Sequence, residues 1–102
     1  MIVRFWRGRT QRADKAAYLA FLKEKGLSGY RATPGNLGIT LMTRDVGDTT
    51  EYLLMTCWTS LDAIRAFAGP DVDKAVYYPE DDGFLPDFPK KVEHFEVVSE
   101  EH

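Results

Sequence analysis

One histidine and a group of aromatic side chains are the residues of this chain best suited to chemistry. His94 lies in the middle of an expected strand rather than in a tail, and the ordinary histidine pKa of about 6.5 lets its side chain exchange protons at neutral pH. Trp58 ends another apolar run, and Tyr77 and Tyr78 stand together in a loop-like stretch. Such rings stack on planar ligands, and phenols also donate hydrogen bonds to them. This set predicts a pocket for a small aromatic or apolar ligand, with His94 as its catalytic proton acceptor.

Each of these residues also has a structural interpretation. His94 can serve as a hydrogen-bonded link between a strand and a loop, with Asp81 or Glu80 as its partner. Trp58 can pack in a core or at a subunit interface. Arginines are candidates for stabilising an anionic intermediate or for plain surface charge, and the strand phase leaves open which of them points inward. The arginines concerned are Arg4, Arg7 and Arg44.

The elements that position these residues follow from the spacing of apolar side chains. Alternation predicts a first strand over Ile2–Arg9, and three- and four-residue spacing predicts a helix over Ala13–Lys25 with Gly26 as its C-cap. The stretch Ser28–Asn36 is rich in turn-forming residues. Two further strands, Leu37–Val46 and Glu51–Trp58, are separated by a short polar break that is typical of a hairpin.

The rest of the chain is expected to hold a second helix and a last strand. Thr59 and Asp62 are suitable for a capping box, and Gly69 with Pro70 ends the helix. Asp71 is expected to cap another turn that ends at Pro79. The final segments are a loop over Gly83–Pro89 and a strand over Val92–Val98.

This order predicts one α+β domain over residues 1–102, with the ferredoxin-like arrangement βαββαβ. Both helices lie on one face of a four-stranded antiparallel sheet. The other face needs a cover, and a chain of this length has no further element to supply one. We therefore expect a homodimer in which two sheets close into a barrel with a cavity between them.

Composition excludes several classes of function. The net charge of −3 argues against a polyanionic partner, and Glu51–Trp58 lacks the basic and aromatic pattern of an RNA-binding strand. No apolar run approaches the ~20 residues of a membrane span, so a cytoplasmic protein is expected. No metal-binding spacing is present, Asp81-Asp82-Gly83 is typical of a turn, and the single Cys57 is expected to be a small core hydrophobe. Basic residues near the start and acidic residues near the end are expected to neutralise each other in part.

Short motifs spread over nearly the whole chain carry a family resemblance. These pieces are Val3–Arg7, Pro34–Gly38, Trp58–Ser60 with Ala66–Gly69, and Val92–Val97. Together they resemble antibiotic biosynthesis monooxygenase-like domains, which pair into dimeric α+β barrels. The resemblance implies oxidation of an electron-rich phenol or quinol without metal, flavin or other cofactor, in a dry pocket with a base and hydrogen-bond donors. His94 is then the base, and the expected substrate contacts are Trp58, Tyr77, Tyr78, Arg4 and Phe67.

Other relatives in this group cleave haem, and the sequence departs from their pattern. Those relatives carry an asparagine in the first strand, a tryptophan in the helix after the third strand and a histidine further along. Here Met1–Thr10 contains no asparagine, and Phe67 and Tyr77 stand near the other two places. Tyrosinate can ligate haem iron, so haem binding stays a weaker alternative.

A second alternative is a non-catalytic binding or stress-related protein that uses the same cavity, because a fold does not determine a function. One titratable group beside several aromatic residues favours the enzyme. The lack of a second base or a clear oxyanion site favours the binding protein.

Overall fold

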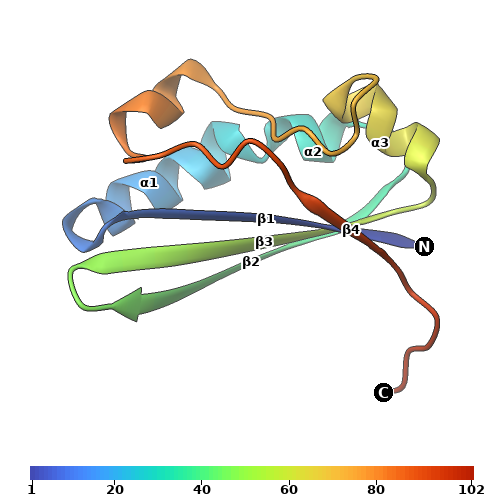
Figure 1. Ribbon diagram of the computed structural model, residues 1–102, viewed down its shortest axis with the longest axis horizontal. Helices are drawn as coiled ribbons and strands as arrows, with labels where there is room; N and C mark the ends of the chain where they lie inside the picture. Colours follow the sequence, from blue (N-terminus) through green and yellow to red (C-terminus); the bar gives the residue numbers. More distant parts are fainter.

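The computed structural model describes residues 1–102 and has two layers, a sheet with all helices on one face (Figure 1). The sheet contains four antiparallel strands in the order β2-β3-β1-β4. This is the expected ferredoxin-like α+β fold. Its elements are β1 (Ile2–Gln11), α1 (Lys15–Phe21), α2 (Ser28–Ala32), β2 (Asn36–Val46), β3 (Thr49–Trp58), α3 (Leu61–Ala68) and β4 (Glu93–Glu96). No helix is long and apolar enough to cross a membrane.

Strand alternation assigns side chains to the two faces of the sheet. Arg4, Trp6 and Thr10 of β1 are buried toward the helices, and the even-numbered residues of β3 from Thr50 to Trp58 are buried beside them. Neighbouring positions point to the open face, because successive side chains of a strand alternate. Cys57 is therefore only half-buried on the open face, and its predicted place in the core is wrong.

The first crossover is more helical than the sequence predicts. After α1 the chain makes one turn of π-helix at Leu22–Gly26 and continues into α2, where a turn-rich connector was expected. The aromatic ring of Tyr30 accounts for α2, because it is buried against Phe67 at a centroid distance of 4.2 Å. Gly26 has no positive φ and is not a C-cap. A Cβ at this glycine would come within 2.7 Å of Leu22, so the glycine allows a close approach.

The hairpin between β2 and β3 is confirmed, with Gly47 at a φ of 59° in a two-residue loop. The helix α3 is also confirmed, but its N-cap is Ser60 rather than Thr59. The Ser60 hydroxyl accepts a hydrogen bond from the Ala63 backbone N–H at 3.2 Å. Gly69, with a φ of 92°, ends the helix as expected.

Residues Pro70–Val92, which we call the strap, run back along the helical layer and return to the sheet at β4 (Figure 1). Asp71 caps one turn as expected, because its Oδ1 accepts from the Asp73 backbone N–H at 3.2 Å and its carbonyl accepts from the Lys74 N–H at 3.2 Å. The turn does not continue to Pro79, because the backbone then pairs with the returning chain through a bridge between Lys74 and Lys91. A single turn of 3-10 helix forms instead at Pro79–Gly83. The strap thus places Tyr77, Tyr78 and Asp81 above the sheet.

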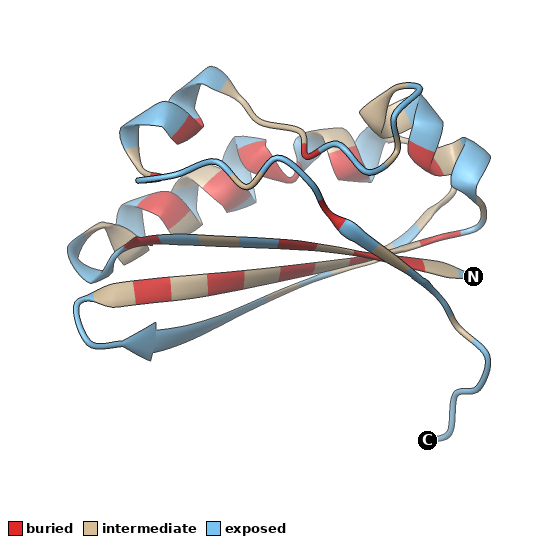
Figure 2. Cartoon of the chain, viewed as in Figure 1, coloured by how far each residue is buried: buried red, intermediate tan, exposed pale blue.

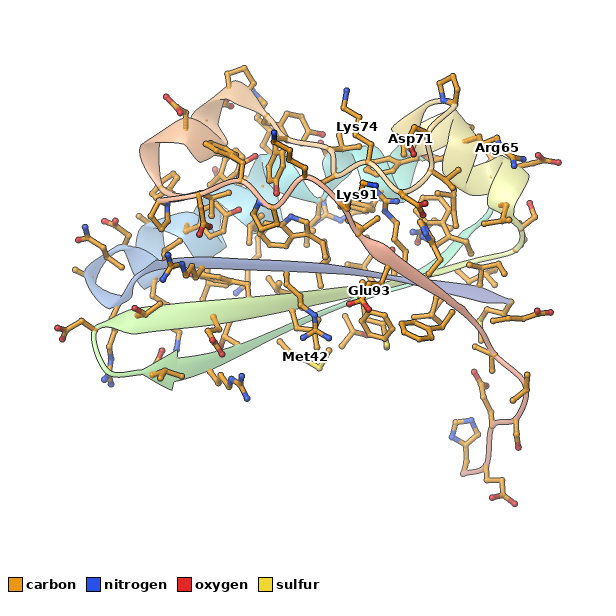
Figure 3. All side chains as sticks on the ribbon, in the orientation of Figure 1. Met42, Arg65, Asp71, Lys74, Lys91 and Glu93 are labelled. Carbon is orange, nitrogen blue, oxygen red and sulfur yellow. The ribbon has the colours of Figure 1, made fainter.

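The core lies between the sheet and the helical layer, where the buried residues of both layers meet (Figure 2). The opposite face of the sheet has no covering layer (Figure 1). Met42 points away from the helices on that face (Figure 3), and it is 39% exposed.

Candidate functional site

A small aromatic pocket lies between the sheet, the first helical crossover and the strap. Its volume is about 20 Å³, which is room for about one water molecule. Its lining is Trp6, Tyr18, Leu22, Gly26, Leu27, Tyr30, Leu41, Leu54, Val76, Tyr77, Tyr78 and Asp81. The walls are apolar, and the polar groups that face them are phenols, one indole and one carboxylate.

The carboxylate of Asp81 is buried in this pocket and is held by two donors. The Tyr18 hydroxyl donates to Oδ1 at 2.8 Å, and the Tyr78 backbone N–H donates to Oδ2 at 2.8 Å. Only 4% of Asp81 and 1% of Tyr18 are exposed. Burial, together with the neighbouring Asp81 carboxylate, raises the pKa of Tyr18 far above its usual range. Tyr18 therefore stays protonated and keeps donating to Asp81.

Trp6 and Tyr77 form a second polar contact on the pocket wall. The Trp6 indole N–H donates to the Tyr77 hydroxyl at 2.9 Å, and that hydroxyl donates to the backbone carbonyl of Pro89. Burial raises the pKa of Tyr77. Gly8 is required beside Trp6, because a Cβ there would come within 2.2 Å of the indole ring. The Tyr77 hydroxyl thus has its proton and one lone pair already engaged.

Tyr30 connects the pocket to the buried ring of Trp58 and the half-buried ring of Phe67. Its ring lies 4.2 Å from that of Phe67 and 6.5 Å from that of Trp58, centroid to centroid. Burial raises the pKa of Tyr30 to about 12, and the Arg4 guanidinium beside it opposes part of this rise. The Trp58 indole N–H is satisfied by the Thr56 hydroxyl at 2.8 Å. Trp58 is therefore a core residue and does not line the pocket.

Arg4 is the buried cation of the molecule and holds the start of the strap. Its terminal nitrogens donate to the carbonyls of Val72 at 2.6 Å and Lys74 at 2.9 Å. Phe67 lies below the guanidinium, with its centroid 5.7 Å away. Nε of Arg4 has no partner.

His94 of β4 lies next to Arg4 of β1 and does not line the pocket. One terminal nitrogen of Arg4 lies 3.2 Å from His94 Nε2, and Asp73 Oδ1 lies 3.1 Å from His94 Nδ1. Arginine only donates, so Nε2 is the acceptor and Nδ1 carries the proton that goes to Asp73. Burial and the Arg4 charge lower the pKa of His94, against the opposing effect of Asp73. The strap partner of His94 is thus Asp73, and the expected partners Asp81 and Glu80 are wrong, because the register places His94 beside Arg4.

The structure brings some of the sequence-predicted site residues together and separates others. Tyr77 and Tyr78 share the pocket, whereas Arg4, Phe67 and His94 form a group on the far side of Tyr30. The base role of His94 stays a prediction, and its lone pair is engaged by Arg4. Sequence reasoning missed the lining residues Trp6, Tyr18, Tyr30 and Asp81. Tyr18 could have been identified, because it places a hydroxyl in the apolar stripe of the first helix. Asp81 could not, because it belongs to a sequence that is typical of an exposed turn.

The open face of the sheet divides into an apolar half and a charged half. The apolar half contains Val3, Phe5, Leu53, Met55, Cys57 and Phe95. Phe5 and Phe95 meet edge to face at 5.7 Å, and Phe95 is 55% exposed. In the charged half, Arg7 pairs with Glu93, Arg9 with Asp87 and Arg44 with Glu51. The expected neutralisation between the two ends of the chain is thus confirmed for Arg7 and Arg9.

Arg7, Arg9 and Arg44 also border a hollow of about 410 Å³ at the charged end of the open face. Each of the three guanidinium groups already has a carboxylate partner. The hollow therefore presents balanced charge rather than a free cationic site.

Comparisons with known proteins agree with this architecture. The sequence profile of the antibiotic biosynthesis monooxygenase family matches residues 1–75, which include every element from β1 to α3. A search of curated proteins gives no match.

Three solved structures show the same fold. One is described as an antibiotic biosynthesis monooxygenase from Bacillus cereus, with a TM-score of 0.64, 12% identity and coverage of 99% of this chain and 96% of that chain. A MhuD variant with two manganese protoporphyrin IX molecules per active site has a TM-score of 0.62 and 20% identity, with coverage of 100% of this chain and 99% of that chain. A heme-degrading protein of Mycobacterium tuberculosis has a TM-score of 0.57 and 22% identity, with coverage of 100% of both chains. These structures show the fold, and the match to the sequence profile over residues 1–75 shows the family. The chain belongs to the antibiotic biosynthesis monooxygenase family.

Proposed function

We propose that the protein is a cofactor-independent monooxygenase that oxidises a small phenolic substrate in the pocket between the sheet and the strap. The observation that carries the proposal is the composition of this pocket, which has aromatic walls, several phenolic hydroxyls and one buried carboxylate. Membership of the family supports the same chemistry. An enclosed apolar site with a few polar groups is the usual form of a small-molecule site.

The proposed reaction needs a proton acceptor and donors for the resulting anion. The substrate loses its hydroxyl proton, and its anion gives one electron to O₂. The two radicals combine in a C–O bond, and the resulting peroxide takes up the proton that the base had accepted. Loss of water from this hydroperoxide leaves a carbonyl. A tyrosine hydroxyl of the lining can stabilise the anion, and the apolar walls keep bulk water out. His94 is the base that the sequence predicts, and it requires Arg4 to release Nε2 before it can act.

The substrate enters in this proposal by displacement of the strap, because the closed pocket holds about one water molecule. Val76, Tyr77, Tyr78 and Asp81 form the strap side of the pocket. Their movement opens the pocket without disturbing the sheet. Lid segments that enclose the substrate are common in enzymes.

We also propose that two copies pair through the open faces of their sheets. The apolar half of that face exposes Phe95, and the chain after β4 leaves the sheet on the same side (Figure 1). Pairing removes this apolar surface from water. Light scattering at micromolar concentration is expected to give twice the chain mass, and Met55→Lys to give the monomer mass. A monomer at all concentrations for the unsubstituted chain contradicts the pairing.

The second candidate function is non-catalytic binding of a small apolar ligand. The observation that favours it is that the hydroxyl groups of Tyr77 and Tyr18 already make hydrogen bonds within the protein. They are therefore not free to take part in a reaction. A binding protein retains the ligand unchanged, and no oxygen is consumed.

The pocket residues do not fit a haem group. The pocket lining contains no histidine, cysteine or methionine. The Tyr77 hydroxyl, the nearest equivalent of an iron ligand, is held by Trp6 and Pro89. We expect hemin titration to give no stoichiometric Soret shift and no breakdown with a reductant. Observation of both contradicts this expectation and makes Tyr77 the candidate ligand.

Oxygen uptake by the purified protein tests the proposed function. The assay contains EDTA, no added flavin, and a panel of phenols and hydroquinones. We expect uptake of one O₂ per substrate oxidised for at least one member of the panel. Binding without uptake supports the binding protein instead, and uptake that needs an added metal or flavin contradicts the cofactor-independent reaction.

A further inference from the structure

Asp81 is the carboxylate that lines the aromatic pocket, and its surroundings differ from those of the other acidic residues. Most acidic side chains are exposed or paired with a cation, as Asp87 is with Arg9. Asp81 is 4% exposed and has no ion pair. A buried carboxylate without a cation is costly, so a position that keeps one calls for a function or a strong structural reason.

The hydrogen bonds of Asp81 leave its carboxyl oxygens with capacity to accept further donors. Both oxygens accept, one from the Tyr18 hydroxyl and one from the Tyr78 backbone N–H. An ionised carboxylate offers about four lone-pair directions. Two of them accept from no donor of the protein.

The other polar groups of the pocket are unsuited to accept a proton. Burial raises the pKa of Tyr18, Tyr30 and Tyr77, so these phenols remain protonated donors. The Trp6 indole N–H only donates. His94 lies outside the lining, and its lone pair is engaged by Arg4.

We propose that Asp81 accepts the hydroxyl proton of the phenolic substrate and that Tyr18 is a positioning residue that fixes the carboxylate. This inference rests on the proposed function and names the group that starts the reaction. The substrate O–H bond breaks, an O–H bond forms on a carboxyl oxygen of Asp81, and the electron pair stays on the substrate oxygen. Asp81 therefore hydrogen-bonds the bound phenol before the proton moves.

Because Asp81 belongs to the strap, closure of the strap over a substrate also positions the proton acceptor. Its carboxylate accepts from the Tyr78 N–H within the same 3-10 turn, so it moves with that turn. When the strap closes on a substrate, the turn brings the carboxylate to the substrate hydroxyl, while Tyr18 on α1 meets it from the opposite wall. Closure and positioning of the base are then one event.

The first test is a binding measurement that needs no turnover. Phenol and anisole have similar shapes, but only phenol donates a hydrogen bond. Isothermal titration is expected to show phenol binding about tenfold or more tightly than anisole to the unsubstituted protein, the effect of one hydrogen bond to a charged group. Asp81→Asn is expected to lose this preference, and Asp82→Asn, an exposed change in the same turn, is expected to keep it.

The outcomes of this titration separate the two proposals. If neither ligand binds, the proposed function of the pocket fails and this inference fails with it. If both bind equally to the unsubstituted protein, or Asp81→Asn keeps the preference, the pocket stands as an aromatic site and the role of Asp81 is overturned.

Kinetics with a phenol that the protein oxidises then distinguish a general-base role of Asp81 from a structural role. Asp81→Asn is expected to lower kcat by ~10² to 10⁴, the usual effect of losing a general base, with a smaller change in KM. It is also expected to remove the acidic limb of the pH profile of kcat/KM, whereas Tyr18→Phe is expected to shift that limb. A folded Asp81→Asn protein with unchanged kcat and unchanged pH profile makes Asp81 a structural residue only.

Discussion

Arg4 and Asp81 are both buried charges that contact the strap, but their surroundings assign them different tasks. Arg4 donates to the Val72 and Lys74 carbonyls and to His94, and it lines neither the aromatic pocket nor the hollow on the open face. Asp81 has two donors, faces a pocket and retains lone pairs. A buried charge surrounded by fixed backbone partners fastens the chain. A buried charge with spare capacity beside a cavity is suited to a ligand.

The backbone hydrogen bonds of the strap also differ between the part near Arg4 and the part near Asp81. Near Arg4, the Ala75 N–H donates to the Lys90 carbonyl and the Val92 N–H to the Asp73 carbonyl, so the two arms of the strap are tied together. Near Asp81, the hydrogen bonds of the 3-10 turn are local to residues 78–85. Side-chain contacts such as Tyr18–Asp81 and Lys25–Glu80, rather than backbone hydrogen bonds, tie this turn to the helical layer. Such a turn moves more readily than two arms joined by backbone hydrogen bonds. We therefore place the opening of the pocket at the Asp81 turn.

The largest stability effect is expected from Arg4→Met. The substitution leaves the partly buried Val72 and Lys74 carbonyls without their donors, which costs about 3 kcal/mol of unfolding free energy for the two hydrogen bonds to a charged group. Urea unfolding measures the loss. Arg65→Met is the control, since Arg65 is exposed on α3 and pairs only with Asp62 (Figure 3), and its change is expected to stay within about 0.5 kcal/mol. Equal losses for the two variants would remove the anchoring role of Arg4.

A smaller effect is expected from Tyr18→Phe. It deletes the hydroxyl that donates to Asp81, and a hydrogen bond to a charged group contributes about 1.5 kcal/mol. The ring contacts with Tyr52 and Phe84 remain, so packing is preserved. The same urea experiment measures it. A loss as large as that of Arg4→Met would mean that the Asp81 contact is a main support of the fold, and the contrast between the two charges would disappear.

The smallest effect is expected in the pH dependence of stability through His94. Its folded-state pKa is lowered, so the unfolded chain binds a proton first as the pH falls below about 6.5. Stability that is present above this pH is therefore lost as the pH falls toward the folded-state pKa. Thermal unfolding of the unsubstituted protein and of His94→Gln across this range measures the difference. Parallel curves for the two proteins would contradict the assigned tautomer and its contact with Arg4.

Local patterns were sufficient to predict most of the fold. Alternation identified β1 and β3, the polar break identified the hairpin, and Gly69 ended α3 as expected. The helix α2 was missed because the Tyr30 contact with Phe67 that accounts for it joins distant parts of the chain. Tertiary contacts of this kind override turn propensity.

The site was less predictable for the same reason. Tyr77 and Tyr78 were identified by type and position, and both line the pocket. His94 was placed in the last strand correctly, but the register that sets it beside Arg4 depends on the pairing of two distant strands. The burial of Asp81 depends on Tyr18, which lies 63 positions earlier in the chain.

Oxygen uptake by two variants tests most directly where the chemistry takes place. With a phenol that the unsubstituted protein oxidises in the presence of EDTA, Asp81→Asn is expected to lose ~10² to 10⁴ in kcat, and His94→Gln to lose far less. Circular dichroism and light scattering verify that both variants keep the fold and the mass of the parent. The opposite order, a large loss for His94→Gln beside an active Asp81→Asn, would place the base at the Arg4 end of the strap and contradict the account given for the pocket.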